Sequence, residues 1–394
     1  MREARERLRR ALTALGFDEV RFAAVAPAPA GGLRAWLAAG YQADMHWLER
    51  TADRRLAPEL VLPGARTVIA LGVNYFDGAP APAAPRPVWA RYAAYSDYHD
   101  ALRPALARAG ALLEEICGVG PGDYRWCVDT GPVVERGWAA RAGLGFAGKN
   151  AMLISRRHGN WLFLAAILTR APIEPDGPLG AQTGGPGAPR GPAPDSVGLL
   201  CGTCTRCLDA CPTQAFPRPG VVDSRRCISY QTIENRGVIP RPLRAGIGTR
   251  VYGCDVCLEV CPWNRFARAG RRTLLAARGE AAALSWEELL AMTPERFAAV
   301  FRATPVKRLK LAGLLRNACV AAGNSGEQTL LGPLARLAEH GAPLVRVHAV
   351  WAVRRLAGAA RAEGLLRAAR AAETDPLVLE EYAAGAAEPT APAP

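Results

Sequence analysis

Two stretches of sequence decide how this chain is organised: C-G-T-C-T-R-C-L-D-A-C-P from Cys201 to Pro212, and C-D-V-C-L-E-V-C-P from Cys254 to Pro262. The first has the C-x2-C-x2-C-x3-C-P spacing of bacterial ferredoxins, in which three thiolates bind one cubane and the fourth binds the other. The second repeats this pattern, but its leading cysteine lies upstream at Cys227. The spacing therefore predicts a ferredoxin-like module with two adjacent [4Fe-4S] clusters.

The crossed arrangement of two-cluster ferredoxins divides the eight cysteines into two sets of four. The two predicted ligand sets are Cys201, Cys204, Cys207 and Cys261, and Cys227, Cys254, Cys257 and Cys211. Zinc is a weaker alternative, because a zinc ribbon uses two separated pairs of ligands. Disulfides are weaker still, since the charged start of the chain, residues 1–10, does not resemble a secretion signal and predicts a reducing, cytoplasmic compartment.

The length and composition indicate several domains. The chain has 394 residues, of which 50% are hydrophobic, so it can bury two or three separate cores. Its longest apolar runs, 68–73 and 161–168, are much shorter than the roughly 20 residues of a membrane span. We expect a soluble α+β protein with no membrane partner. The predicted boundaries are 1–170 for a mixed α/β domain, 171–198 for a Pro/Gly-rich linker, 199–270 for the cluster module, 271–372 for a helical domain and 373–394 for a tail.

Periodicity predicts the elements inside these domains. In the N-terminal domain we expect helices over 2–15, 36–50, 98–117 and 139–142, strands over 20–25 and 67–74, a strand ending at Val128, and a hairpin-like pair over 151–155 and 161–169. In the C-terminal domain we expect helices over 285–290, 294–301, 309–322, 329–339, 343–356 and 360–371. The paired C-terminal helices favour stacked hairpins of the HEAT kind.

The charge of the chain predicts an acidic partner. The formal net charge is +13, for which nucleic acid is the natural partner, although an arginine-rich coding bias would give the same charge. Between Pro305 and Ala372 the chain has eleven Lys and Arg against three Glu. A solvated helical face usually mixes its signs, so this surplus favours contact with a phosphate backbone.

Two other motifs allow both a structural and a chemical interpretation. V-D-T-G-P-V-V-E-R places Asp129 between an expected strand and a Gly-Pro turn, where it can face a cavity or merely cap the turn. The glycine-rich G-L-G-F-A-G-K-N ends at Asn150, so it lacks the G-K-[ST] order of a phosphate-binding loop.

In combination these motifs resemble the epoxyqueuosine reductase family, the cobalamin-dependent iron–sulfur enzymes that complete queuosine in transfer RNA. The resemblance runs from near the start to about Ala372 and includes both cysteine runs. Its other motifs are L-P-G-A-R-T-V-I-A-L-G-V-N-Y (62–75), S-D-Y-H (96–99), V-D-T-G-P-V-V-E-R (128–136), A-G-L-G-F-A-G-K-N (142–150), R-C-I-S-Y-Q-T-I-E (226–234) and K-R-L-K-L-A-G-L-L-R-N (307–317).

The resemblance implies a cofactor and a reaction. It implies a cobalamin without its lower axial base, held by the N-terminal domain and the cluster module and reduced by the clusters. Asp129 matches the family's proton donor and would protonate the departing epoxide oxygen. The residues that it implies for cofactor contact are Asp129, Lys149, Asn150, Met152, Ser229, Tyr230, Gln231 and Asp255, with either Arg50 or Arg54 reaching the corrin and Arg54 chosen.

The implied partners are a transfer RNA with epoxyqueuosine at the wobble position and a low-potential donor of the flavodoxin or ferredoxin type. The family also suggests a monomer. Two alternatives stay open: a cobalamin-dependent reductive dehalogenase acting on a small molecule, and an electron-transfer protein in which Asp129 is only structural. The basic C-terminal helices argue against the first, and the size of the N-terminal domain argues against the second.

Overall fold

Two compact units make up the chain. The computed structural model describes residues 2–26, 30–80, 86–179 and 196–384. The first unit comprises Met1–Ala79, Asp97–Ser224 and Val256–Ala276, and the second comprises Pro80–Ser96, Arg225–Asp255 and Ala277–Pro394. The first cysteine run therefore lies within the first unit, whereas the cysteines of the second run are divided between the two. The units are built from segments distant in sequence and are described separately below.

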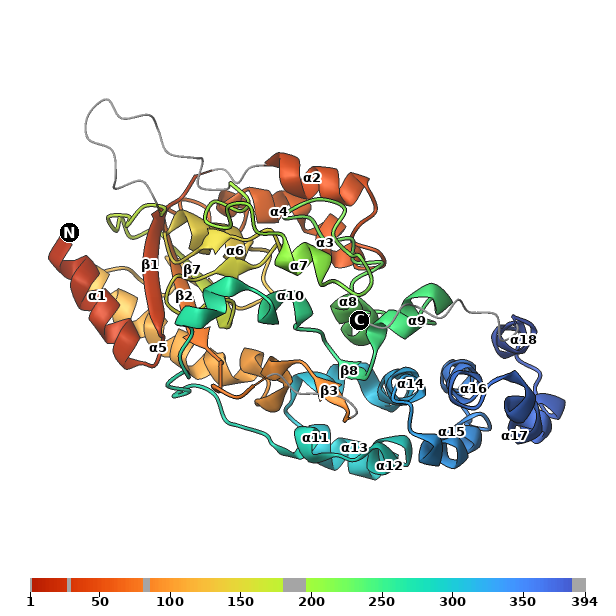
Figure 1. The fold of residues 1–394 in the computed structure, drawn as a ribbon. Helices are drawn as coiled ribbons and strands as arrows, with labels where there is room; N and C mark the ends of the chain where they lie inside the picture. Colours follow the sequence, from red (N-terminus) through yellow and green to blue (C-terminus); the bar gives the residue numbers. More distant parts are fainter. Residues whose placement is uncertain (1, 27–29, 81–85, 180–195, 385–394) are drawn as a thin grey trace. The chain divides into compact units, whose positions relative to one another are not determined.

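A four-stranded antiparallel sheet is the centre of the first unit (Figure 1). Its order is β1 (Glu19–Ala24), β2 (Thr67–Asn74), β7 (Leu162–Thr169) and β4 (Tyr124–Cys127). Every residue of β2 is buried, which an apolar strand covered on both faces requires. The predicted buried strand over 67–74 is therefore confirmed.

Helices cover this sheet. α6 (Glu135–Arg141) packs on β2 and β7, where Trp138 and Ala139 share a core with Val68 and Leu168. α1 (Arg2–Ala14) packs on β1 and on α5 (Tyr98–Cys117), with Leu8 and Leu12 buried. The predicted helices at 2–15 and 98–117 are confirmed to within one residue at each end.

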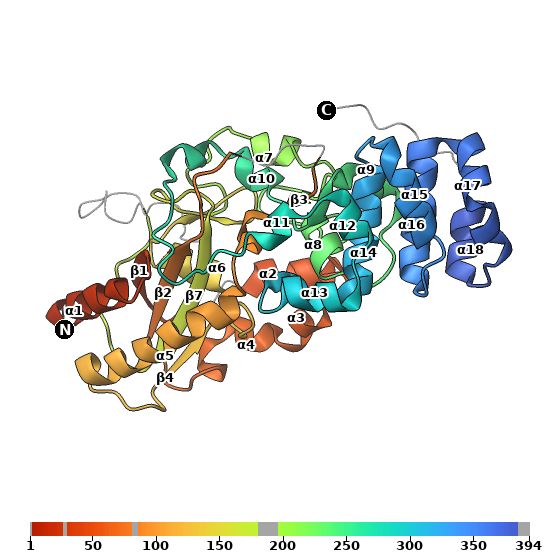
Figure 2. The ribbon, with the colours of Figure 1, turned by 90° about the horizontal axis from the view of Figure 1, so that it is seen from below.

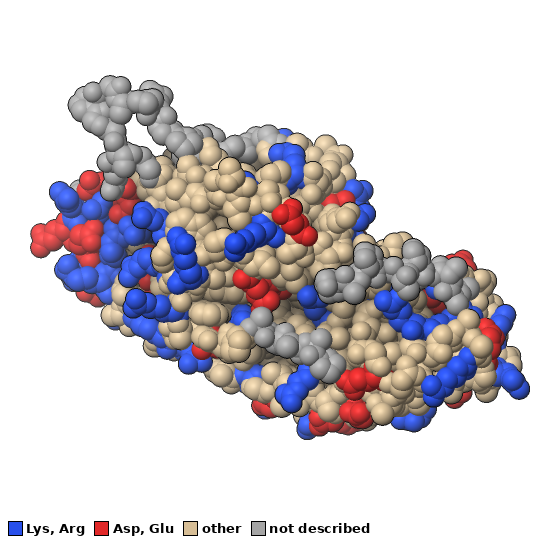
Figure 3. Space-filling model, in the orientation of Figure 1, with Lys and Arg blue, Asp and Glu red and all other residues tan. Residues whose placement is uncertain are grey.

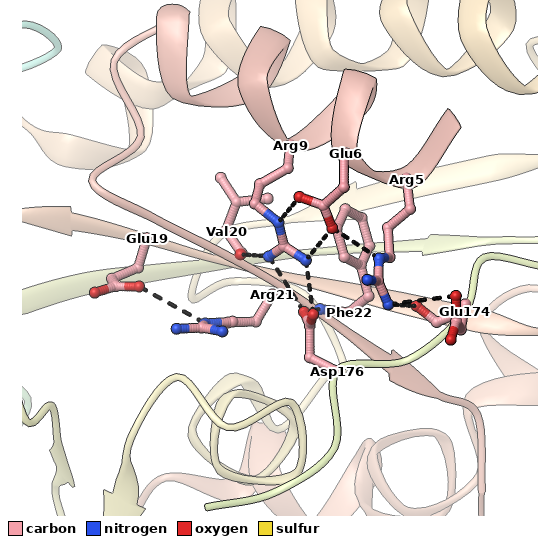
Figure 4. Close-up of polar contacts among 9 residues, drawn as sticks. All are labelled: Arg5, Glu6, Arg9, Glu19, Val20, Arg21, Phe22, Glu174 and Asp176. Atoms are coloured by element: carbon pink, nitrogen blue, oxygen red, sulfur yellow. Dashed lines mark hydrogen bonds and ion pairs between the residues drawn. The ribbon is translucent and has the colours of Figure 1, made fainter. Parts of the chain in front are cut away.

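The segment after β7 is held firmly at its start. Asp176 accepts hydrogen bonds from the Arg9 guanidinium, at 2.6 and 3.2 Å, and from the backbone N–H of Phe22 (Figure 4). Thr67 donates through Oγ1 to the carbonyl of Ala171 at 2.7 Å. The loose linker predicted from residue 171 is thus wrong for residues 171–176, because side chains of α1 and β2 bind them. The rest of that prediction falls largely on 180–195, outside the described residues.

Two other local predictions differ from the structure. The expected hairpin of 151–155 with 161–169 is wrong: β6 (Leu153–Ile154) pairs with β5 (Phe146–Ala147), whereas β7 pairs with β2 and β4. The expected helix 36–50 is broken by a turn over residues 39–45. The remaining elements of this unit are α2 (Ala30–Ala38), α3 (His46–Arg50), α4 (Ala52–Leu56), η1 (Pro58–Leu60), α7 (Arg206–Asp209), α10 (Val256–Glu259) and η3 (Pro262–Phe266).

The second unit is mainly helical (Figure 2). Its two short strands, β3 (Val88–Trp89) and β8 (Arg250–Tyr252), are parallel. The helices before residue 300 are η2 (Arg91–Ala94), α8 (Ile228–Ile233), α9 (Arg241–Ile247), α11 (Glu280–Ala283), α12 (Trp286–Leu290) and α13 (Pro294–Phe301). The later ones are η4 (Pro305–Leu309), α14 (Lys310–Gly323), η5 (Gln328–Leu330), α15 (Leu331–Leu337), α16 (Pro343–Ala357), α17 (Ala359–Ala371) and α18 (Pro376–Ala383).

The predicted C-terminal helices are confirmed apart from shifts at their ends, but α18 was not predicted. It packs on α16 through Val378 and Tyr382, both buried, so part of the expected tail belongs to the core of this unit. Among the described residues, no helix has the length and apolar character needed to cross a bilayer.

Candidate functional site

Asp129 lies just beyond the end of β4 in a backbone conformation that the chain must enforce. β4 ends at Cys127, which pairs with Ala166 of β7, and two residues later Asp129 has a φ of 53°. This left-handed conformation is uncommon for residues other than glycine, and aspartate is among the few that tolerate it. The Asp129 side chain is 58% exposed. The turn therefore presents this carboxylate at the surface of the first unit.

The start of α5 meets this carboxylate with two side chains. The Tyr98 hydroxyl donates to Asp129 Oδ2 at 2.7 Å, and His99 Nε2 lies 3.3 Å from the same oxygen. Asp97 is the N-cap of α5 and accepts from both the backbone N–H and Nδ1 of His99, the latter at 2.7 Å. The Tyr98 ring stacks on His99 and on Phe163 of β7. One helix start therefore fixes both partners of Asp129.

The histidine in this group holds a proton at neutral pH. Burial alone would lower the pKa of His99, but its hydrogen bonds to Asp129 and Asp97 outweigh burial and raise the pKa to about 9. A protonated His99 donates from both ring nitrogens, which matches its two carboxylate partners. In this group His99 carries an acidic proton and shares it with the carboxylates of Asp97 and Asp129.

Glu135, at the start of α6, is a second carboxylate near Asp129. Its Oε1 is buried and has no hydrogen-bond partner among the described residues. Burial, with a smaller contribution from the negative charge of Asp129, raises the pKa of Glu135 to about 7, although a backbone hydrogen bond and the charges of Arg55 and Arg136 act in the opposite direction. This carboxyl can therefore gain or lose its proton close to neutral pH.

Four cysteines of the first predicted ligand set surround one cavity in the first unit. The cavity has a volume of about 210 Å³, and its lining includes Cys201, Cys204, Cys207 and Cys261. Burial, together with the charges of the other three thiols, raises the pKa of Cys207 to about 11, as expected where four thiols converge. The structure therefore brings Cys261 of the second run to the first three cysteines of the first run; that these four hold one cluster stays a prediction.

Lys149 and Asn150 hold the loops around this cavity. Lys149 Nζ donates to the carbonyls of Gly202 and Cys204, at 2.7 and 3.1 Å. Asn150 is 2% exposed, and its amide donates to Asn160 Oδ1 and to the carbonyl of Cys257. The polar atoms that the resemblance assigns to corrin contact are thus bonded to the cysteine loops. Their task in this structure is to position thiols.

The second predicted ligand set is divided between the units. Cys211 and Cys257 belong to the first unit, and Cys227 and Cys254 belong to the second. No group of three or more His, Cys, Asp or Glu within the described part of the chain is arranged to hold a single metal ion. The assignment of these four cysteines to one cluster stays a prediction.

Within the second unit, the predicted cofactor residues lie on α8 and before α10. Tyr230 and Gln231 are buried on α8, whereas Ser229 is half-buried. Gln231 already donates to the carbonyl of Arg225 and accepts from Asn235. Asp255 Oδ2 accepts from the backbone N–H of Arg91 at 2.7 Å.

Two buried polar residues of α14 hold α8 and β8 in place. Arg316 donates to the carbonyls of Gln231, Asn235 and Gly237, at 2.7 to 2.9 Å. Asn317 donates to the carbonyls of Thr232 and Val251, at 2.8 and 2.9 Å. These bonds give the motif K-R-L-K-L-A-G-L-L-R-N a structural purpose. It fixes the helix that carries Ser229, Tyr230 and Gln231.

Of the last two predicted cofactor residues, Met152 lies at an apolar cavity of the first unit and Arg54 lies on α4. Met152 lines this cavity, whose volume is about 320 Å³, together with Leu56, Val134 and Trp138. The cavity is much smaller than a corrinoid, so it can receive only part of one. Arg54 is exposed on α4 and makes no ion pair with any described residue.

The basic surplus of the second unit is partly structural. Arg354 is 9% exposed and donates to the carbonyls of Glu381 and Tyr382, at 2.8 and 2.9 Å. Arg346 pairs with Glu373 through two hydrogen bonds, and Arg316 is buried. The exposed basic residues that remain in this stretch are Lys307, Lys310, Arg336, Arg355, Arg361, Arg367 and Arg370.

Sequence reasoning assigned no role to Tyr98, His99, Asp97 or Glu135. The motif S-D-Y-H was noted, and its Asp-x-His spacing at the start of an expected helix was the available signal. Glu135 belongs to the motif V-D-T-G-P-V-V-E-R, but the motif gives no sign of its role, because that role depends on burial next to Asp129.

Two family models match this chain. One is described as "4Fe-4S double cluster binding domain" and matches residues 200–264; the other is "Epoxyqueuosine reductase QueG, DUF1730" and matches residues 55–130. The first spans the cysteine cavity and both cysteine runs. The second contains β2, α5 and β4, and ends just after Asp129.

Curated relatives are similar over most of the chain. An epoxyqueuosine reductase of Xanthomonas campestris pv. campestris is 36% identical over 334 residues, covering 82% of this chain and 87% of that protein. That of Escherichia coli is 36% identical over 328 residues, covering 82% of this chain and 81% of that protein. The chain belongs to the epoxyqueuosine reductase family, and it is an oxidoreductase.

Solved structures of this family have the same fold. An epoxyqueuosine reductase crystallised with an epoxyqueuosine-modified tRNA-Tyr stem loop matches with a TM-score of 0.83 and 28% identity, covering 96% of this chain and 97% of that one. An epoxyqueuosine reductase from Bacillus subtilis, with its catalytic aspartate loop swung out of the active site, matches with a TM-score of 0.80 and 28% identity over the same shares.

Proposed function

We propose that this chain reduces epoxyqueuosine to queuosine in transfer RNA. Family membership supports the reaction, and the relative crystallised with a modified stem loop supports the substrate. Removing the epoxide oxygen as water while a carbon–carbon double bond forms consumes two electrons and two protons. The chain must therefore supply both electrons and protons at one site.

Asp129 is the proposed proton donor, with His99 as its source of protons. The observation that carries this assignment is the pair of hydrogen bonds by which His99 links Asp129 to Asp97. A proton passes from His99 Nε2 to Asp129 Oδ2, and Asp129 gives it to the departing oxygen. The exposed, left-handed turn at Asp129 suits a group that must reach a bound substrate, and the Bacillus subtilis relative has a catalytic aspartate loop that swings out of its active site.

Glu135 is a candidate for handling the second proton. A buried carboxyl with a pKa of about 7 gains and loses a proton readily under ordinary conditions. The negative charge of Asp129 acts on Glu135, so the proton of Glu135 responds to the charge at Asp129. The two carboxylates and His99 then act as one coupled group.

Redox groups held by the chain's cysteines would supply the electrons. Cys201, Cys204, Cys207 and Cys261 fit one [4Fe-4S] cluster, because their thiols surround a cavity of suitable size. Cys211, Cys227, Cys254 and Cys257 are the proposed ligands of the other. A base-off cobalamin supplies the low-valent metal chemistry when bound. The proposed cobalamin contacts are Arg54, Met152, Ser229, Tyr230 and Asp255. The residues proposed to hold the surrounding loops and helix in place, without touching the cofactor, are Lys149, Asn150 and Gln231.

The transfer RNA would lie against the exposed basic residues of the helical domain. Because Arg316, Arg346 and Arg354 have buried or paired guanidinium groups, the residues proposed for phosphate contact are the exposed ones, such as Lys307, Lys310 and Arg336. Replacing any one of these residues should weaken binding by a similar amount for every RNA sequence and reduce the salt dependence of binding.

The test compares Asp129→Asn with the unaltered protein in a single turnover. Under anaerobic conditions, protein with reconstituted clusters and cobalamin is mixed with epoxyqueuosine-containing transfer RNA. The RNA is then digested, and its nucleosides are identified by mass spectrometry. Asp129→Asn should retain both cofactors and bind RNA while conversion falls by about a hundredfold or more. Near-normal conversion would remove Asp129 from the mechanism. Loss of halide from a small organohalide, with no conversion of the RNA, would instead favour a reductive dehalogenase.

A further inference from the structure

A basic surface of the first unit adjoins the cavity of the four cysteines. The short helix η3 connects the two regions: Trp263 lines the cysteine cavity, and Phe266 lines a neighbouring cavity of about 510 Å³. The two rings lie 5.5 Å apart, and the Trp263 indole donates to the carbonyl of Leu200. We call this surface the docking face and define it as Arg156, Arg157, Arg265, Phe266, Arg268 and Arg271.

The positive charge of the docking face is only partly neutralised by neighbouring carboxylates. All five arginines are exposed, and among the described residues Asp18 pairs with Arg271 at 2.8 Å and Glu19 lies 3.6 Å from Arg157. Within the described part of the chain, Arg156 and Arg268 form no ion pair. Figure 3 shows basic side chains grouped on the first unit beside the mixed-charge end of α1. This surface suits a negatively charged partner.

The cysteine cavity lies close to the molecular surface on this side. The loop between Cys201 and Cys207 exposes Gly202, Thr203, Thr205 and Arg206. Next to it, Leu200 is 39% exposed and Phe266 is 42% exposed. A cluster held by these cysteines would thus have an apolar, solvent-accessible edge bordered by arginines. This combination of a small apolar centre and a charged rim is typical of brief, electrostatically steered encounters.

The order of the two clusters favours this side for the incoming electron. Ser229, Tyr230 and Asp255, which are proposed to contact the corrin, adjoin Cys227 and Cys254 in the sequence, and both cysteines belong to the second ligand set. The second cluster would therefore pass electrons on to the corrin. The first cluster is then left to receive them from outside.

We propose that the docking face binds an acidic electron carrier of the flavodoxin type and that its electrons pass into the cluster of Cys201, Cys204, Cys207 and Cys261. This inference rests on the two-cluster part of the proposed function. In each encounter an anionic flavin hydroquinone would lose one electron, keep its proton and become the neutral semiquinone, while the oxidised cluster would gain that electron. Two encounters supply the two electrons that one epoxide requires.

RNA is the other polyanion that such a face could meet, but the aromatic side chain argues against it. The Arg265 guanidinium lies 4.6 Å from the centroid of the Phe266 ring, so one face of that ring is covered and not open to a stacked base. The adjacent cysteine cavity has no use in binding RNA, whereas an electron carrier must come close to it. The geometry therefore favours the carrier.

The test measures cluster reduction in the absence of RNA. A double variant, Arg156→Glu with Arg268→Glu, reverses two charges without breaking an intramolecular ion pair. Its matched control is Arg10→Glu with Arg108→Glu, which reverses two exposed charges on α1 and α5. The iron content of each protein is matched beforehand, and reduction by flavodoxin hydroquinone is followed by stopped-flow absorbance. At low ionic strength the docking-face variant should be reduced about tenfold more slowly than the control, and the difference should vanish near 1 M salt.

Two further readouts make the result decisive. Reduced methyl viologen is a small cation, and it should reduce the clusters of the docking-face variant no more slowly, because a less positive surface repels it less. An unchanged rate with flavodoxin hydroquinone overturns the proposal, and so does an equal slowing with viologen. Loss of transfer RNA affinity with unchanged cluster reduction would assign the face to RNA and overturn it too. If the RNA reaction itself fails with a chemical reductant, the proposed function fails while the docking result stands.

Discussion

The hydrogen bonds around His99 lead to a prediction that does not depend on turnover. Removing the charge of Asp129 in Asp129→Asn takes away one of the two carboxylates that hold the proton on this ring. Burial, which disfavours the imidazolium, stays the same. The pKa of His99 should therefore fall in this variant, and it should fall again when Asp97 is also replaced by Asn.

The size of the effect follows from the two partners. A pKa of about 9, against an ordinary value of 6.5, corresponds to at most about 3 kcal/mol in favour of the charged ring, and solvent around the 58% exposed Asp129 reduces the share of that residue. We expect Asp129→Asn to lower the pKa of His99 by about one pH unit and Asp97→Asn to lower it by somewhat more. The double variant should titrate below the ordinary histidine range, because only burial is left.

Histidine-selective NMR can measure these values directly. The chain has five histidines, so signals from ring-labelled protein can be assigned by single replacement of each. His46 is a suitable internal reference, because it is exposed on α3. A pH titration that begins in mild acid and continues past the raised pKa of about 9 covers all the variants.

The result that refutes this reasoning is a His99 pKa near 6.5 in the unaltered protein, or one that does not respond to Asp129→Asn. Either would mean that the contacts of Asp129 and Asp97 do not stabilise the imidazolium. The proposed proton source for Asp129 would then be lost. If the pKa is confirmed, turnover limited by this proton should decline as the pH rises through about 9.

Three further predictions concern stability and cluster content. Because the folded-state pKa of Glu135 is raised to about 7, the folded chain binds a proton that the unfolded chain has released, and the free energy of unfolding falls as the pH rises from 4.5 to 7. Glu135→Gln should remove up to about 3 kcal/mol of that fall, measured by anaerobic urea denaturation. An unchanged pH dependence would contradict the burial argument. Cys261→Ala should lose the same cluster as Cys201→Ala, leaving about four irons per chain by iron analysis, whereas separate losses would refute the crossed assignment. Arg316→Ala should lower the free energy of unfolding by about 3 kcal/mol or more, because it removes buried hydrogen bonds. Replacing the exposed Arg336 by Ala should change the free energy of unfolding by no more than about 0.5 kcal/mol. Equal effects would show that the hydrogen bonds of Arg316 contribute little.

The cluster ligands were the most predictable part of the site. Cysteine spacing is set by the size of the cubane, so a local pattern contains the information needed to group Cys201, Cys204 and Cys207. Membership of Cys261 in that group followed from the crossed connection, and the structure brings its thiol to the same cavity. The roles of Lys149 and Asn150 did not follow, because their partners are backbone carbonyls far away in sequence.

The proton-handling group was only partly predictable. The sequence singled out Asp129 but not its environment, since His99 reaches it from a helix that begins about thirty residues earlier. The ionisation of His99 depends on two hydrogen bonds and on burial together, and none of these is visible in a linear motif. For the same reason Glu135, with its buried Oε1, was missed.

Charge counting was least reliable in the C-terminal helices. A surplus of arginines predicts a phosphate-binding face only if their guanidinium groups are exposed. Arg316 and Arg354 instead satisfy buried carbonyls, which a count of charges cannot distinguish from surface residues. The elements themselves were well predicted, because their apolar periodicity is long and regular.

The most direct test of the central claim is the mass of the modified nucleoside after a single turnover. Cluster-reconstituted protein with cobalamin and a low-potential reductant is incubated anaerobically with epoxyqueuosine-containing transfer RNA, in parallel with Asp129→Asn and with Cys261→Ala. The account predicts loss of one oxygen from the nucleoside in the unaltered protein and little or none in either variant. Retention of the oxygen by the unaltered protein, while its clusters are reduced and reoxidised, would contradict the assigned substrate.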